Sequence, residues 1–489
     1  MMLVPVLLSY FFFMSQSLRL DEAQSLWQVS RGVTDIFTII AADVHVPLYH
    51  LFLHFWIIYL GNTVPVARTL SMVLYLVSIP ALYSLGKLAY GRSAGLFAAF
   101  LFSISPFMNW YGNEVRMYTL FTLFAILNQY FFIRLFKDRQ EKNRDASDHV
   151  WVGYILTAVL GVFSHYFFFL ILVAQLVFYF LHQSLFARGS LKRFAFAALV
   201  VCGAFLPWGW YVLHLGQAGF QEPALATPSS VNLFSAFSQF MFGFQNDNVN
   251  TFFLSLWPIS VLFAFFILGR NQRMLPETEY FVTTILVSFA IAFFGSFIVA
   301  PIFVSRYLIF TVPSLYLLLA SLLENFEPRV ARLARYSFAA VMLVMLWVEI
   351  ASPTTPTKEN YALAAAYLNT HTTPQDVILL SAPFTVYPVQ YYYRGASPIA
   401  TLPNWNQYVY GPIPAFSESA LGAQVASSTQ NSQNVYLLLS YDQGYESKIK
   451  NYFDTHYQQL YTQNFSKDLN LYVYKLRYDT TLSAVATTL

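Results

Sequence analysis

Eight ionisable residues stand at the ends of long apolar runs or in the polar segments between them, and their types suit chemistry on a phosphorylated substrate. A carboxylate can act as a general base toward a hydroxyl group, and arginines can hold a phosphate through paired, charge-assisted hydrogen bonds. Most of the eight also have an ordinary explanation, as a solvated loop pair or a salt bridge at a helix start. The arginines are harder to explain in that way, because ionisable groups at membrane depth are costly and usually have a partner of opposite charge. The eight residues are Asp21, Glu22, Asp43, His45, Glu114, Arg116, His165 and Arg306.

The elements that must position these residues are membrane-spanning helices. The sequence is 57% hydrophobic and 10% charged, whereas soluble chains average about 25% charged residues. Apolar runs close to the length of a bilayer span recur along the first 350 residues. We expect about eleven spans, near residues 3–16, 65–86, 93–108, 117–136, 151–164, 166–181, 194–213, 251–268, 280–299, 307–323 and 337–350. The first is not expected to be a cleaved signal peptide, because it lacks a charged n-region and an A-x-A-like cleavage site.

Lysines and arginines predict the orientation of these spans, because such clusters favour the cytoplasmic side. They gather at Lys87 and Arg92, at residues 137–144 and 188–193, at Arg270 and Arg273, and at residues 329–335. The eight candidate residues and the C-terminal segment are then expected to lie outside the cytoplasm, on a multi-pass protein of the cell (cytoplasmic) membrane. The net charge of +3 reflects the basic clusters and does not indicate a nucleic-acid partner. Cys202 is the only cysteine, so no disulfide is expected within the chain.

The composition changes near Ser352 and predicts two domains. Residues 1–350 are expected to form an all-α polytopic membrane domain that carries the catalytic site, and residues 351–489 a small extracytoplasmic α/β domain. The first outer loop covers about residues 17–64 and includes an amphipathic run at 47–61 that suits a juxtamembrane helix. The aromatic cluster at 387–393 suits a protein core better than lipid headgroups, although both remain open. In the C-terminal domain we expect strands near 377–380 and 435–439, and helices near 359–369 and 445–453.

Five short motifs, in the same order and on the same side of the membrane, resemble those of the GT-C glycosyltransferases. The likeness covers roughly residues 15–350, and the closest branch contains the bacterial protein O-mannosyltransferases and the aminoarabinose transferase of lipid A (glycosyltransferase family 39-like). One departure is His45-Val46-Pro47, where the family often shows His-Pro-Pro. The motifs are Arg19-Leu20-Asp21-Glu22, Asp43-Val44-His45-Val46-Pro47-Leu48-Tyr49, Gly112-Asn113-Glu114-Val115-Arg116-Met117-Tyr118, Ser164-His165-Tyr166 and Ser305-Arg306-Tyr307-Leu308.

This resemblance implies an inverting transfer of a sugar from a polyprenyl-phosphate donor to a hydroxyl group of a protein, lipid or glycan. It makes Asp21 the catalytic base and Arg306, with Arg116 as a second candidate, the residues that neutralise the departing phosphate. No cofactor is expected with certainty, although Asp43, His45 and His165 could bind a divalent metal ion. The implied substrate-binding residues are Glu22, Asp43, His45, Tyr49, Glu114, Arg116, Tyr118, His165, Arg306 and Tyr307.

Two other classes of function compete with this interpretation. A membrane transporter or flippase usually has symmetry-related repeats and polar, Gly/Pro-broken spans at mid-membrane, and the sequence shows neither. A non-catalytic envelope assembly factor would tolerate decay of the site, but Asp21, Glu22 and Arg306 are all intact. The sequence leaves open which sugar moves, what accepts it, whether metal is needed and the oligomeric state.

Overall fold

The fold is that of a computed structural model, which describes residues 2–43, 45–142, 146–215, 227–245, 247–255, 274–324, 326, 328–351, 358–409, 412–430 and 432–476. These residues form two compact units. The first contains the residues up to Ser15 and those from Gly32 to Ala351, and the second contains Gln16–Arg31 together with the residues from Lys358 onward. The predicted membrane domain, residues 1–350, contains Gln16–Arg31. In the structure this segment, which carries Asp21 and Glu22, belongs to the second unit.

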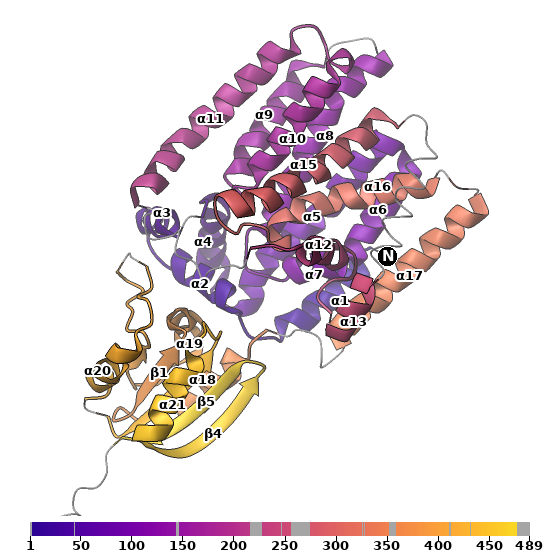
Figure 1. The fold of residues 1–489 in the computed structure, drawn as a ribbon. Helices are drawn as coiled ribbons and strands as arrows, with labels where there is room; N and C mark the ends of the chain where they lie inside the picture. Colours follow the sequence, from indigo (N-terminus) through magenta and orange to yellow (C-terminus); the bar gives the residue numbers. More distant parts are fainter. Residues whose placement is uncertain are drawn as a thin grey trace, which may run out of the picture. The chain divides into compact units, whose positions relative to one another are not determined.

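The first unit is helical throughout its described part (Figure 1). Every predicted span except 251–268 falls on a helix, and that exception lies mostly outside the described residues. The helices are α1 (Leu3–Met14), α3 (Val33–Ala42), α4 (Leu48–Leu60), α5 (Val64–Tyr90), α6 (Arg92–Ile104), α7 (Pro106–Gly112), α8 (Tyr118–Lys142), α9 (Asp148–Val162), α10 (Phe168–Leu181), α11 (Ser190–Leu215), α12 (Ser230–Phe242), α13 (Asp247–Ser255), α15 (Pro276–Ile298), α16 (Val312–Glu324) and α17 (Pro328–Ala351), with short 3-10 helices η1 (Gln183–Leu185) and η3 (Ser305–Thr311).

Six of these helical segments are long and apolar enough to cross a bilayer within the described part of the chain. They are α5, α8, α11, α15, η3 continued by α16, and α17; a seventh span arises if α6 and α7, bent by 62° at their junction, count as one. Apolar side chains cover the outer surface of α11, where Leu199, Leu206 and Leu213 are 69%, 66% and 70% exposed. Such a surface suits contact with lipid tails. The chain is therefore a multi-pass membrane protein, and the total of eleven spans stays a prediction.

Two local features shape the path of the chain from α5 to the turn that carries Glu114 and Arg116. At Gly86 and Gly95 helices α5 and α6 touch backbone to backbone, since a Cβ atom built on Gly86 would lie 2.7 Å from Cα of Gly95. Small residues allow such close packing of membrane helices. The chain then breaks at Ser105-Pro106, where the Ser105 hydroxyl accepts a hydrogen bond from the Met108 N–H at 3.2 Å and proline begins α7. Helix α7 leads directly into the turn that carries Glu114 and Arg116.

The second unit is an α/β domain that also includes helix α2. Its five-stranded sheet has the order β2-β1-β3-β5-β4, with β1 parallel to β2 and β3, and β5 antiparallel to β3 and β4. The two predicted strands are the central pair β1 and β3, and they are almost wholly buried, as is typical of parallel strands covered on both faces. The elements are α2 (Leu20–Val29), α18 (Tyr361–His371), β1 (Val377–Ser381), η4 (Pro383–Thr385), α19 (Val386–Tyr392), β2 (Ile399–Thr401), α20 (Glu418–Thr429), β3 (Asn434–Ser440), α21 (Glu446–His456), β4 (Gln458–Ser466) and β5 (Leu469–Lys475).

The aromatic cluster at 387–393 contributes to the core of this second unit. Tyr387 and Tyr393 are each 7% exposed, and Val389 between them is 1% exposed. The Tyr393 hydroxyl accepts a hydrogen bond from the Ser397 N–H at 3.0 Å. Burial of this kind agrees with the expectation of a core rather than a lipid-facing surface.

Candidate active site

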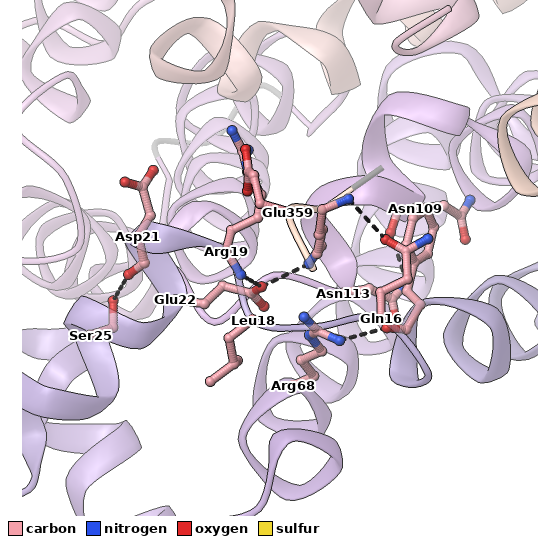
Figure 2. A network of polar contacts seen from close by, with 12 residues as sticks. Gln16, Leu18, Arg19, Asp21, Glu22, Ser25, Arg68, Asn109, Asn113 and Glu359 are labelled. Carbon is pink, nitrogen blue, oxygen red and sulfur yellow. Dashed lines mark hydrogen bonds and ion pairs between the residues drawn. The ribbon is translucent and has the colours of Figure 1, made fainter. Parts of the chain in front are cut away.

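Asp21 and Glu22 occupy the first turn of α2, where an acidic side chain is favoured by the partial positive charge of a helix N-terminus. The Glu22 carboxylate accepts a hydrogen bond from the Arg19 N–H at 2.9 Å and so caps the helix. Glu22 is fully buried, whereas Asp21 is partly exposed. Figure 2 shows the two carboxylates pointing in different directions. Glu22 therefore caps α2, whereas Asp21 is the more exposed of the two acids.

The other candidates belong to the first unit, where His45 and Arg116 form a direct pair. Nη2 of Arg116 lies 2.8 Å from Nε2 of His45, and Nδ1 of His45 lies 2.7 Å from the Asp43 carbonyl oxygen. A guanidinium group can only donate, so Nε2 accepts its hydrogen bond and Nδ1 carries the proton donated to Asp43. The Tyr166 hydroxyl also donates to the His45 carbonyl oxygen at 3.0 Å. Nδ1 thus fixes the His45 ring on Asp43, and Nε2 orients Arg116.

A tight turn between α7 and α8 holds Arg116 from its other end. Its N–H donates to the Glu114 carbonyl oxygen at 2.8 Å, and its own carbonyl oxygen accepts from the Ser71 hydroxyl at 3.4 Å. The Ser71 hydroxyl also bonds the hydroxyl of Tyr49 at 2.8 Å. Glu114, Arg116 and Tyr49 are 1%, 6% and 0% exposed. Tyr49 therefore supports the backbone of this turn through the Ser71 hydroxyl.

His165 lies in the turn between α9 and α10 and is neutral. Its Nδ1 accepts a hydrogen bond from the Phe167 N–H at 3.1 Å, and its ring stacks on Phe121 with a centroid distance of 4.7 Å. Burial lowers the pKa of His165 to about 3, and the positive charges of Arg116 and Arg306 act in the same direction. His165 is therefore an uncharged partner in a region of positive charge.

Arg306 and Tyr307 complete this cluster from the start of η3. The Arg306 guanidinium lies 5.5 Å from the centre of the Tyr307 ring, and that ring lies 5.4 Å from the His165 ring. The Tyr118 ring is 6.2 Å from His165 on another side. Arg116 is linked to the His165 turn through His45, whose carbonyl oxygen accepts the Tyr166 hydroxyl, and Arg306 is linked to it through the Tyr307 ring. The first unit thus brings together His45, Arg116, Tyr118, His165, Arg306 and Tyr307. Asp43 joins them through its hydrogen bond with His45, and Glu114 through its hydrogen bond with Arg116.

The suggested metal ligands do not come together in the described part of the chain. No group of three or more His, Cys, Asp or Glu side chains in the described ranges could hold a metal ion. Asp43 and His45 are adjacent, with Oδ2 3.3 Å from Nδ1, but Nε2 of His45 is already bonded to Arg116. A metal at Asp43, His45 and His165 would require this arrangement to change.

Part of the chain matches a family model, and nearly all of it aligns with a solved structure. Residues 44–211 match the model of the family described as dolichyl-phosphate-mannose-protein mannosyltransferase. No curated protein matches the sequence. Among solved structures, ArnT from Cupriavidus metallidurans in the apo state aligns with a TM-score of 0.61 at 12% identity, over 97% of this chain and 96% of that one. The same protein bound to undecaprenyl phosphate aligns with a TM-score of 0.61 at 13% identity, over 97% of each chain.

The chain therefore shares the fold of ArnT, and its segment 44–211 matches the mannosyltransferase family model; both findings agree with the GT-C resemblance drawn from its motifs. The matched segment contains His45, Tyr49, Glu114, Arg116, Tyr118 and His165. Asp21, Glu22, Asp43 and Arg306 lie outside that segment, and their assignment rests on the motifs and on the geometry described above.

Lys358, which none of the sequence motifs indicated, lies beside Glu22 in the second unit. The lysine Nζ lies 3.0 Å from Oε2 of Glu22, and neither side chain is exposed. A lysine that follows a Ser/Thr/Pro-rich stretch suggests a solvated linker, and no local pattern indicates a partner 336 residues away. Its only signal in the sequence is the adjacent acid Glu359, so that a base precedes an acid at the start of the C-terminal domain, as Arg19 precedes Glu22 in the first outer loop.

Proposed function

We propose that this protein transfers a sugar from a polyprenyl-phosphate donor to a hydroxyl group on an extracytoplasmic acceptor. The observation that carries the proposal is that Arg116, through His45 and Tyr166, and Arg306, through Tyr307, are both linked to the turn that holds His165 in the membrane unit. Two guanidinium groups beside a neutral histidine favour an anion, and the phosphate of a lipid-linked sugar is an anion that belongs at a membrane interface.

In this proposal Asp21 removes the proton from the acceptor hydroxyl as its oxygen forms a bond to the anomeric carbon of the sugar. The bond from that carbon to the phosphate oxygen breaks, and the lipid phosphate leaves with the electron pair. Attack and departure take place on opposite faces, so the configuration at the anomeric carbon inverts. Arg306 and Arg116 stabilise the charge that builds up on the departing phosphate.

The remaining residues prepare the phosphate site before the donor arrives. The hydrogen bonds of His45 to Arg116 and Asp43 set the direction of the guanidinium group. Preformed donors of this kind need little reorganisation when charge develops in the transition state. Because His165 stays neutral, it can line the site without adding a cation that would repel Arg116 or Arg306. Tyr118 and Tyr307 supply aromatic walls.

Two further points support a lipid-linked donor. The apolar surfaces of helices such as α11 suit a long hydrocarbon tail lying in the bilayer. ArnT from Cupriavidus metallidurans, which shares this fold, has been solved bound to undecaprenyl phosphate. On the orientation expected from the basic clusters, the site opens outside the cytoplasm, where a lipid phosphate is the natural carrier of an activated sugar.

The test uses the full chain in lipid nanodiscs with synthetic polyprenyl-phosphate donors that carry a radiolabelled hexose or pentose. Labelled sugar should move to an acceptor from a panel of peptides, lipids and glycans, with release of polyprenyl phosphate in equal amount. A donor that crosses the bilayer without losing its sugar would support a flippase instead. Binding of donor with neither transfer nor crossing, for every acceptor in the panel, would favour an assembly factor.

A further inference from the structure

Two ion pairs join the start of α2 to the start of the C-terminal segment. In one pair α2 supplies the acid, and in the other the residue before α2 supplies the base. Glu22 pairs with Lys358 at 3.0 Å, and Arg19 pairs with Glu359 at 3.8 Å. The Tyr441 hydroxyl donates to the other oxygen of Glu359 at 2.7 Å. Acid meets base in both pairs, so the charges of the two segments are complementary only in this pairing.

Hydrogen bonds from backbone N–H groups to side-chain oxygens also hold this region together. The Lys358 N–H donates to Oε1 of Gln16 at 3.3 Å, and the Ala362 N–H donates to the Ser17 hydroxyl at 3.1 Å. The Leu18 N–H donates to the hydroxyl of Tyr392 at 2.9 Å. We call these contacts, between residues 16–22 and residues 358–362 together with Tyr392, the α2 clasp.

Of the two ion pairs in the α2 clasp, the Glu22–Lys358 pair has the greater free-energy cost of disruption. The side chains of Glu22 and Lys358 are both 0% exposed, whereas those of Arg19 and Glu359 are 27% and 17% exposed. Removing one member of a buried ion pair leaves an uncompensated charge in a low-dielectric environment, which is strongly unfavourable. Glu22 in turn holds the first turn of α2 through the Arg19 N–H.

We infer that Lys358 is a positioning residue for Asp21, and that the C-terminal domain therefore takes part in catalysis. This inference rests on the proposed function of Asp21 as the base. Asp21 and Glu22 are consecutive residues of the same helical turn, so any movement of Glu22 moves Asp21. A displacement of about 1 Å in a reacting group, even one caused by a change away from the chemistry, can cost about a hundredfold in rate.

The test compares Lys358→Met, which keeps the length of the side chain and removes its charge, with Lys448→Met. Lys448 belongs to the same unit and also forms an ion pair, with Glu418 at 2.8 Å, but these side chains are 50% and 66% exposed. Exposed pairs contribute little, so the control should retain wild-type turnover. Lys358→Met should lower kcat by about 10- to 100-fold, with KM for the donor within about twofold because the arginines of the phosphate site are untouched.

Two further measurements separate positioning from folding and from direct chemistry. Amide hydrogen exchange in Lys358→Met should become faster in α2 and stay unchanged in β1 and β3. The variant Glu22→Gln keeps an acceptor for the Arg19 N–H, and adding it to Lys358→Met should lower kcat no further than the worse single change, because the two residues act through one contact.

The outcomes are decisive whether or not the proposed function holds. Unchanged exchange in α2 would overturn the inference, and so would faster exchange in β3, which would make Lys358 a residue needed for folding of the domain. Effects of Lys358→Met and Glu22→Gln that multiply in the double variant would also overturn it. If the wild type transfers no sugar, the proposed function fails, but hydrogen exchange still shows whether Lys358 holds α2.

Discussion

Replacing Asp21 with asparagine separates the chemistry of this residue from its structural contribution. Asparagine has nearly the same shape as aspartate but cannot accept the proton of the acceptor hydroxyl. We expect turnover to fall by roughly 10²–10⁴-fold, the usual share of a positioned general base, which corresponds to about 3–5 kcal/mol of transition-state stabilisation.

The structural cost of the same change is smaller. Asp21 lies in the first turn of α2, where loss of a negative charge costs up to about 1 kcal/mol through the helix dipole. The hydrogen bond from the Ser25 hydroxyl goes to the backbone carbonyl of Asp21 at 2.9 Å, so the substitution does not remove it. Asp35 offers a matched control, because it is an exposed acid in the first turn of α3. Asp35→Asn should leave turnover unchanged.

The assay follows transfer of radiolabelled sugar from a synthetic polyprenyl-phosphate donor, with donor binding measured separately by thermal shift. Asp21→Asn should bind the donor almost as the wild type does and transfer very little sugar. Glu22→Gln should cost less, since Glu22 orders the helix. Turnover of Asp21→Asn at the wild-type level would refute the role of general base. If Glu22→Gln is inactive and Asp21→Asn is active, the general base is Glu22 and not Asp21.

Three further predictions concern the phosphate site, its pH response and the membrane topology. Arg306→Ala should weaken donor binding by about 10- to 100-fold, because a hydrogen bond to a charged group contributes about 1.5–3 kcal/mol, and Arg306→Lys should restore only part of it; an unchanged Kd would assign Arg306 to structure. The pKa of His165 is about 3 in the folded protein against 6.5 for a free side chain, so the unfolded chain binds the extra proton and stability should fall as the pH drops from 6.5 toward 3. Thermal unfolding across this range should show a smaller loss in His165→Gln, and an equal loss would contradict the assigned burial. In intact cells, cysteines introduced at Asp138 and Arg332 should be shielded from an impermeant thiol reagent and one at Ser419 should react, whereas the reverse pattern would invert the orientation.

Apolar length predicted where the membrane helices lie better than where they end. Helix α8 continues to Lys142, beyond the predicted end at residue 136, because charged residues end an apolar run without ending a helix. Arg134 and Asp138 form an ion pair one turn apart at 3.0 Å, which supports that extension. The break between α6 and α7 had a signal in Ser105-Pro106, although hydropathy alone joined the two helices into one run.

The candidate site was found through motifs, while its electrostatics depend on contacts that no motif contains. His165 is neutral because residues from α8 and η3, far away in the sequence, bury its ring and place positive charge beside it. Lys358 escaped notice for a similar reason, since its role arises from a contact with Glu22 rather than from its neighbours in the sequence. Residue types predicted which groups could react, and tertiary contacts decide the charge and orientation of each.

The separation between Glu22 and Lys358 also sets an order of events during synthesis. The helix with Asp21 leaves the ribosome early, but its partner follows 336 residues later. At about 5–20 residues per second, translation of the intervening chain takes roughly 20–70 s. During that interval α2 lacks the buried lysine that neutralises Glu22, and an isolated helix of this length is marginal in water. A chain truncated before Lys358 would therefore keep the acid helix but lack the buried partner of Glu22, and on the inference above its Asp21 would be poorly positioned.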